Sequence, residues 1–203
     1  YSTMVGWRAG YSTTTGNSNT FLGNYAGNTN ITGYNIVAVG IQAMYGGTVA
    51  HTSVAVGRDS LYYLGATAGA GKSVGVGDAA GKYATGSYNT FVGASAGAGG
   101  TTSAPFSSGK ENTAMGYQAL TNFTTGGNNT AIGRKALEDV SSGGYNVAVG
   151  NEAGLNLTTG GENVFLGISA GGNTTDVDKA VLIGGGAATG VLTSDADGTV
   201  AIG

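Results

Sequence analysis

Several residue types that stabilise other folds are absent from this chain or scarce in it. Its 203 residues contain no cysteine and one proline, so neither disulfides nor a thiolate metal site can hold it together. The single histidine, His51, leaves one possible centre for a histidine-ligated metal or a catalytic triad, and no partner signature flanks it. We therefore expect no metal and no cofactor.

Charge and long apolar runs are also scarce. Charged residues make up 9% of the chain and the net charge is −3, which offers no electrostatic footprint for nucleic acid. No apolar run approaches the roughly 20 residues that a membrane span needs. We expect neither nucleic-acid binding nor membrane insertion.

Glycine, in contrast, is abundant and recurs with a period. Twelve stretches end in a β-branched residue, one variable residue, a Val, Leu, Ile or Met, and then Gly. These closing glycines are Gly6, Gly23, Gly40, Gly57, Gly77, Gly93, Gly116, Gly133, Gly150, Gly167, Gly184 and Gly203. Seven of their eleven spacings are 17 residues. A short period carried by strand-type residues and punctuated by Gly predicts an all-β fold, a parallel β-solenoid of about twelve coils.

Each coil is expected to contain a strand whose side chains alternate between two faces. The residues three and one before each closing glycine are apolar or Thr and share one face, which we expect to fill the coil interior. The residue between them is never polar and is expected to point outward, where soluble monomers avoid a continuous apolar patch. Other copies of the chain would cover it, although a second layer of the same coil is an alternative. The candidates for a homotrimer interface are Phe21, Ala38, Ala55, Phe91, Ala114, Ala131, Ala148 and Phe165.

Asparagine and a second glycine also recur at fixed places. Asn lies four places before the closing glycine at Asn19, Asn89, Asn112, Asn129, Asn146 and Asn163, with Asn35 displaced by one. Stacked in register, these side chains predict an amide ladder at a corner of the coil. The glycine seven places before the closing one, such as Gly126, is expected to be a turn residue with positive φ.

Two longer steps in the period predict loop insertions near residues 62–71 and 98–110. Insertions in a solenoid emerge on one side and often carry binding, so Tyr62, Tyr63, Pro105 and Phe106 are candidate receptor contacts. The alternative is that both loops are neutral. Residues 66–73 match a loose phosphate-binding loop, but another strand copy follows in place of the required helix, so no nucleotide is expected.

The closest acidic pairs are Asp176 with Asp178 and Asp195 with Asp197. Paired carboxylates can hydrolyse glycosides or bind Ca²⁺. These pairs lie in the least regular repeats, where solvated loops are the simpler interpretation. We expect no catalytic residues, and hence no enzyme.

The repeat beginning at Asn112-Thr113-Ala114-Met115-Gly116, with its copies at 129–137 and 146–154, resembles a repeat of bacteriophage tail-fibre proteins. Its core is similar to the head repeats of trimeric autotransporter adhesins, although the repeat here is longer. The resemblance implies a left-handed trimeric β-roll on an extracellular virion fibre or, alternatively, on a bacterial surface. It also implies contact with a host glycan or protein receptor and with other fibre components.

We therefore expect residues 1–203 to form one solenoid domain, a segment of a longer fibre that spaces or presents receptor contacts. The alternatives are the head of a bacterial surface adhesin, a polysaccharide-cleaving spike and an ice-binding solenoid. Ice binding needs a flat exposed ladder of Thr, and the Thr-containing column is expected on the buried face.

Overall fold

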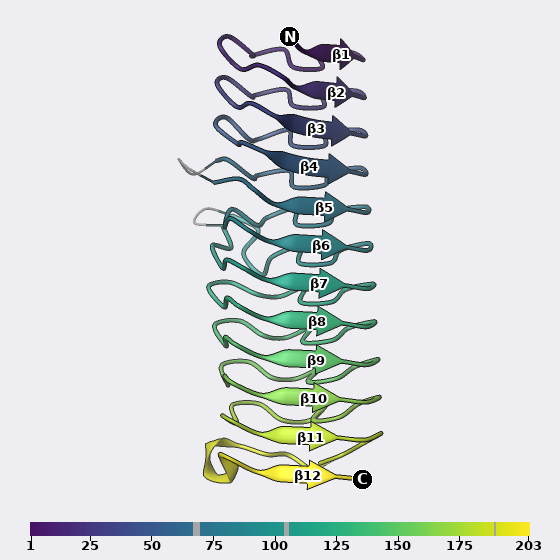
Figure 1. Ribbon diagram of the computed structural model, residues 1–203, viewed down its shortest axis with the longest axis vertical. Coiled ribbons are helices and arrows are strands. Elements are labelled where there is room, and N and C mark those ends of the chain that lie inside the picture. Colours follow the sequence, from purple (N-terminus) through teal and green to yellow (C-terminus); the bar gives the residue numbers. More distant parts are fainter. Residues whose placement is uncertain (67–69, 104–105, 189) are drawn as a thin grey trace.

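The computed structural model describes residues 1–66, 70–103, 106–188 and 190–203. They form a stack of coils with the two termini at opposite ends (Figure 1). The strands are β1 (Thr3–Val5), β2 (Thr20–Leu22), β3 (Ile36–Val39), β4 (Ser53–Val56), β5 (Val74–Val76), β6 (Thr90–Val92), β7 (Thr113–Met115), β8 (Thr130–Ile132), β9 (Val147–Val149), β10 (Val164–Leu166), β11 (Val181–Ile183) and β12 (Val200–Ile202). They pair in sequence order as one parallel sheet, so the predicted β-solenoid is confirmed.

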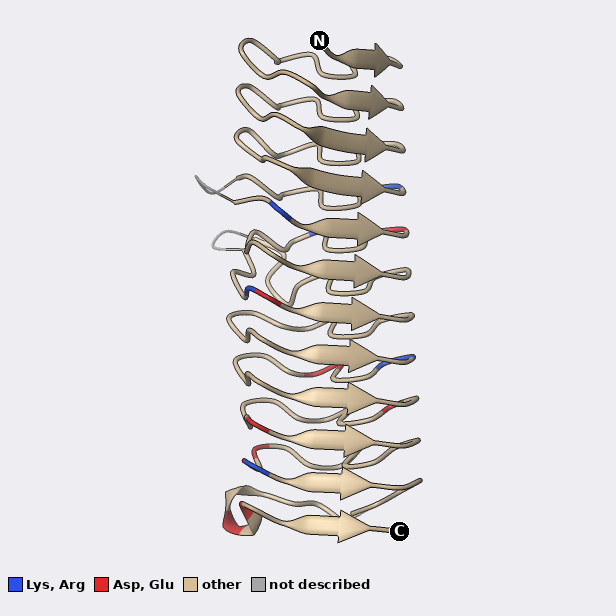
Figure 2. Ribbon diagram, in the orientation of Figure 1, with Lys and Arg blue, Asp and Glu red and all other residues tan. Residues whose placement is uncertain are grey.

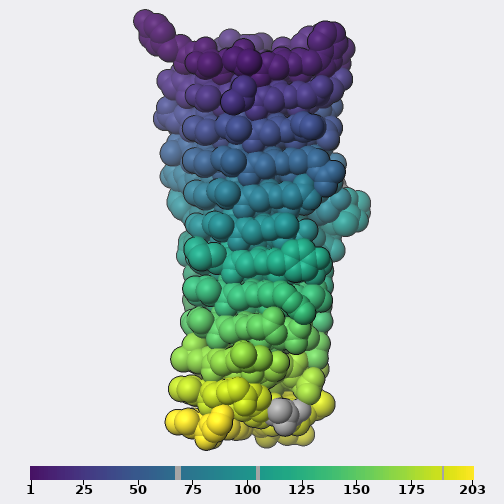
Figure 3. Space-filling view, turned by 90° about the vertical axis from the view of Figure 1, so that its right-hand side faces the viewer, coloured from purple at the N-terminus to yellow at the C-terminus, as the bar shows by residue number. Residues whose placement is uncertain are grey.

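Strand pairing places equivalent residues of successive coils on top of one another. Ala131 of β8 pairs with Ala148 of β9, for example, and the same register continues along the sheet. The longer steps do not disturb it, because Val54 pairs with Val74 and Thr90 pairs with Thr113. The extra residues therefore leave the stack as loops, and in the space-filling view the coils form parallel ridges (Figure 3).

The assignment of the two strand faces predicted from the sequence is wrong. All eight proposed trimer-interface residues, Phe21, Ala38, Ala55, Phe91, Ala114, Ala131, Ala148 and Phe165, are 0% exposed inside a single chain. The flanking strand residues are the ones that point outward, as in β9, where Val147 and Val149 are exposed and Ala148 is buried. The middle column is thus the core of each coil.

Side chains from two positions of the repeat fill the core: the middle residue of the strand and the residue four places after the closing glycine. A large residue at one position is usually accompanied by a small one at the other. Where the middle residue is Phe, the residue four places after the closing glycine is Gly, as with Phe165 and Gly171. A Cβ added at Gly171 would lie 2.6 Å from the Phe165 ring. After Ala38, Ala55, Ala114 and Ala131 that place holds a buried Met or Leu. Ala148 is followed by Gly154 instead, where Leu137 and Phe165 of the neighbouring coils leave no space for a Cβ. Large and small side chains interdigitate in this way to reach native packing density.

The predicted amide ladder is confirmed and lies inside the coil corner. The backbone N–H of Asn146 donates to Oδ1 of Asn129 at 3.0 Å, and that of Asn163 donates to Oδ1 of Asn146 at 3.0 Å. Each Nδ2 also donates to a backbone carbonyl of the next coil, as Asn129 does to Gly143 at 2.9 Å and Asn163 does to Val177 at 2.6 Å. Asn35 is not part of the ladder, because it is exposed and the neighbouring Ile36 takes the buried place.

Positive φ occurs at other glycines than those expected. The closing glycines adopt it, with φ of 134° at Gly133, whereas Gly126 and its equivalents do not. Gly126 is required for a different reason, since a Cβ there would collide with the carbonyl oxygen of Gly143 in the next coil. The other left-handed corners are formed by non-glycine residues, such as Tyr145 with φ 61° and Leu137 with φ 50°, and by further glycines, such as Gly154 with φ 60°.

Helix is nearly absent from the part of the chain described. The short 3-10 helix η1 (Ser194–Ala196) precedes β12, and no described helix has the length and apolar character of a membrane span.

The ladder predicts that replacing two nearby asparagines with alanine will have very different effects on stability. Asn129→Ala would leave the buried Asn146 N–H and the Gly143 carbonyl without partners, which costs about 2–5 kcal/mol of unfolding free energy. Asn151→Ala is the control, because this side chain makes no hydrogen bond within the described residues. Urea denaturation measures both, and equal stabilities would contradict the ladder's role.

Candidate functional site

The outward side chains of the twelve strands form a continuous apolar surface, here called the outer face. It consists of the residues three and one before each closing glycine, which are Thr or Val in the first column and Val, Leu, Ile or Met in the second. Ile132 is 37% exposed and Val149 38% exposed, and no strand residue is charged (Figure 2). At the spacing of parallel strands this face covers about 500 Å². A patch of that size matches the largest apolar patch of a typical monomer, and such patches are often functional.

The two loop insertions meet in space. Phe106 of the second insertion stacks on Tyr63 of the first, with ring centroids 4.2 Å apart, and Tyr63 lies 4.6 Å from Tyr62. Tyr45 and Tyr83 extend the row on either side. We call these five rings the aromatic cluster. Three of the four sequence-predicted receptor contacts therefore lie together, and Pro105 falls outside the described residues.

An ion pair lies beside the aromatic cluster. Nζ of Lys82 donates to Oδ2 of Asp59 at 3.0 Å and lies 5.8 Å from the Tyr62 ring. Burial lowers the pKa of Lys82, but the Asp59 carboxylate outweighs this effect and the pKa is raised overall. Burial, aided by the neighbouring Tyr63, raises the pKa of Tyr62 to about 12. The cluster thus offers aromatic faces, a phenol that stays protonated and a fixed cation.

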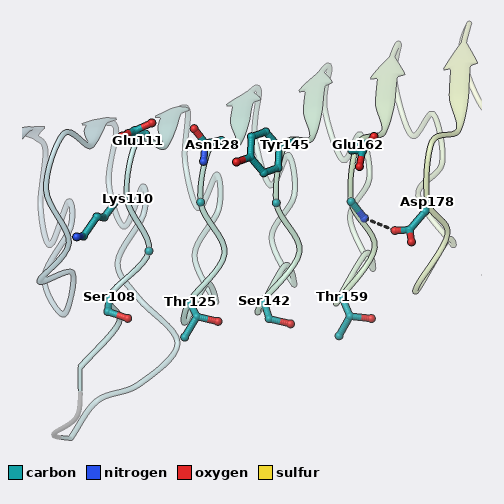
Figure 4. A pocket seen from close by; sticks show the side chains of 14 residues that line it. Ser108, Lys110, Glu111, Thr125, Asn128, Ser142, Tyr145, Thr159, Glu162 and Asp178 are labelled. Atoms are coloured by element: carbon teal, nitrogen blue, oxygen red, sulfur yellow. Dashed lines mark hydrogen bonds between the residues drawn. The ribbon is translucent and has the colours of Figure 1, made fainter.

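A shallow corner groove of about 570 Å³ runs along several coils (Figure 4). One side carries the hydroxyls of Ser108, Thr125, Ser142 and Thr159, and Gly127, Gly144 and Gly161 also line the groove. Glu111, Asn128, Tyr145 and Glu162 form the other side, at the left-handed corner of each coil. The arrangement suits an extended polar ligand, because it repeats one hydroxyl and one backbone group per coil.

The acidic pairs near the end of the chain hold neighbouring coils together. Oδ1 of Asp178 accepts a hydrogen bond from the Gly161 N–H at 2.6 Å, and Oδ1 of Asp197 accepts one from the Asp178 N–H at 2.8 Å. Asp176 accepts a hydrogen bond from the Ser194 N–H at 3.2 Å. These carboxylates occupy the places of groove residues and have a structural role.

The fold does not bring the remaining motifs, within the described residues, into an arrangement typical of a nucleotide or metal site. Ser73 leads directly into β5, so the phosphate-loop pattern lacks its helix, and residues 67–69 of that pattern lie outside the described residues. Within the described ranges, no group of three or more His, Cys, Asp or Glu is placed to hold a metal ion. His51 stacks on Tyr34 with ring centroids 4.3 Å apart.

The class of protein that the fold defines is a parallel β-solenoid with one strand per coil. Comparison with family models, curated proteins and solved structures finds no match to this chain. Its function is therefore argued from its own surfaces: the outer face, the aromatic cluster and the corner groove.

The raised pKa of Tyr62 predicts a loss of stability in alkali. The unfolded chain releases this proton near pH 10, whereas the folded chain keeps it until about pH 12. The contribution of Tyr62 is therefore present below about pH 10 and lost as the pH rises to about 12. Tyr62→Phe should reduce the fall in melting temperature between about pH 9 and about pH 11.5.

The control for this experiment is Tyr117→Phe, at a ring that is 53% exposed. It should reproduce the pH dependence of the unaltered chain. If the two variants respond alike, the environment assigned to Tyr62 is wrong.

Proposed function

We propose that this chain is a rod segment of an extracellular fibre of the bacteriophage tail-fibre kind. In this proposal three copies pack through their outer faces, and the surfaces that remain exposed present contacts to a receptor on the host cell. The observation that carries the proposal is the outer face, which holds no charged residue along the twelve strands and is apolar apart from the Thr residues of its first column.

The outer face supports self-association because of its shape as well as its composition. Its two columns continue in register from β1 to β12, so a second copy meets the same surface at every coil. Three such faces around a common axis would cover one another along their whole length. Closed, symmetric assembly through one repeated patch is the usual arrangement in homo-oligomers.

The charged residues lie outside the proposed interface. The ion pair of Arg58 with Asp78 and that of Arg134 with Glu152 are at the turns that follow the strands, at the edge of the outer face (Figure 2). This division resembles an interface with an apolar core and a polar rim. The aromatic cluster lies on the loops, and the corner groove lies at the corner just before the strands, since Glu111 and Glu162 come two residues before β7 and β10. In this proposal both stay accessible for receptor contact at the rim of the interface.

The proposal predicts that lysines on the outer face abolish assembly. The double variant Ile132→Lys/Val149→Lys would place six ammonium groups in an apolar trimer core, each at a cost of several kcal/mol. Native mass spectrometry should find a trimer for the unaltered chain and a monomer for the variant.

Asn128→Lys is the matched control, because Lys72 and Lys179 already occupy the equivalent corner with positive φ. It should remain trimeric. A monomeric unaltered chain, or a dimer, would contradict the proposed assembly.

The same face favours a second candidate, an ice-binding solenoid. The reason for setting this function aside was an expected burial of the Thr-containing column, but Thr20 is exposed and Thr113 and Thr130 are partly exposed on a regular sheet. Thermal hysteresis of a monomeric chain, lost in Thr113→Lys/Thr130→Lys, would support ice binding over the fibre. A trimer without thermal hysteresis would exclude it.

A further inference from the structure

A second hollow, which we call the basic pocket, lies on the same corner as the groove but closer to the N-terminus. It has a volume of about 340 Å³, and its chemistry is set by Tyr34, His51, Lys72, Ser87, Tyr88 and Lys110. Two of the eight lysines and arginines of the chain line it, and none of its described lining residues is acidic. The pocket is thus positively charged, although the whole chain has a net charge of −3.

The corner groove has the opposite charge along most of its length. Beyond Lys110, where the two hollows meet, its lining includes Glu111, Glu162 and Asp178. Along this corner basic residues come first and acidic residues follow, except that Lys179 lies next to Asp178 in the sequence (Figure 2). An anionic ligand would therefore be attracted to the basic pocket more strongly than to the corner groove.

Near the C-terminus, backbone N–H groups at this corner bind carboxylates of the chain itself. Six places before the closing glycine, the N–H of Gly161 donates to the carboxylate of Asp178 (Figure 4). In the next coil the N–H of Asp178 donates to the carboxylate of Asp197. In the basic pocket the equivalent residues are Gly71 and Ser87. Their N–H groups donate to no described residue. The position that a carboxylate fills near the C-terminus is therefore open between two lysines.

The side chains around this position supply further polar and aromatic groups. Nζ of Lys72 donates to the Tyr88 hydroxyl at 3.1 Å, and this hydrogen bond raises the pKa of Lys72. The Tyr34 ring covers His51, whose buried Nδ1 has no hydrogen-bond partner among the described residues. Flat rings beside hydroxyl and amide donors are suited to sugars, since the rings offer apolar faces and the donors meet the hydroxyls.

We propose that the basic pocket binds a carboxylate-bearing sugar residue of a surface glycan, with the carboxylate held by Lys72, Lys110 and the Ser87 N–H. This inference rests on the proposed receptor-binding function and names the class of receptor. Charge-assisted hydrogen bonds to the two lysines give the affinity, and the rings of Tyr34 and Tyr88 orient the sugar.

Isothermal titration calorimetry of the full chain tests the proposal. The probes are sialyllactose and an oligoglucuronate, each compared with its carboxyl-reduced form, and sodium acetate as a free carboxylate. At least one acidic probe should bind, its reduced form should bind at least about tenfold more weakly, and added salt should weaken binding. Acetate should compete only at far higher concentration.

The variants Lys72→Gln and Lys110→Gln should each weaken binding by about tenfold or more. Lys179→Gln is the matched control, because Lys179 lies at the same corner position as Lys72, with φ 58° against 57°, and away from the pocket. This variant should bind like the unaltered chain. When an acidic probe binds to the unaltered chain, the largest changes in amide NMR chemical shift should be at Gly71 and Ser87.

The proposal is overturned if neither acidic probe binds, if the reduced sugars or acetate bind equally well, or if Lys72→Gln and Lys110→Gln bind like the control. Native mass spectrometry of every variant separates this result from the failure of the fibre proposal. A trimer that ignores acidic sugars would refute the inference alone.

Discussion

The close approach of successive coils at the closing glycines is the constraint on which the rest of the structure depends. A Cβ at Gly133 would collide with the carbonyl of Gly150, and its φ of 134° is one that other residues rarely adopt. Because every closing glycine but the last meets the next in this way, the coils can stack only in register. That register places each column of side chains in a row, and the parallel sheet, the amide ladder and the surfaces all follow from it.

The sequence was sufficient to predict the solenoid, its register and the ladder, but not which face of the strand is the core. Alternation divides strand residues into two sets without saying which is inside, and here both sets are apolar. The distinguishing signal lay elsewhere in the repeat: Phe21, Phe91 and Phe165 occur where Gly27, Gly97 and Gly171 follow, and Ala114 and Ala131 where Leu120 and Leu137 follow. Such exchange of volume is expected only between residues in contact.

The candidate sites were predictable to different degrees. The longer steps identified Tyr62, Tyr63 and Phe106, because an interrupted period reveals an insertion, but their stacking across two coils required the structure. The basic pocket could not be found from local sequence. Lys72 and Lys110 are 38 positions apart, and only the 16- and 23-residue steps between their repeats, taken with the fold, bring them to one corner.

In a solenoid of this kind, different positions of the repeat can serve assembly and ligand recognition. The strand columns repeat nearly the same residue in every coil, which suits contact with an identical copy along the full length. The column six places before the closing glycine instead changes from Tyr34 and His51 through Lys110 to Gly144 and Asp178, so its chemistry varies along the rod. Where that column is glycine the groove is open, and where it is aspartate the chain supplies its own carboxylate. A ligand-specific site can therefore arise by changing a few corner residues, since neither the core nor the outer face includes them.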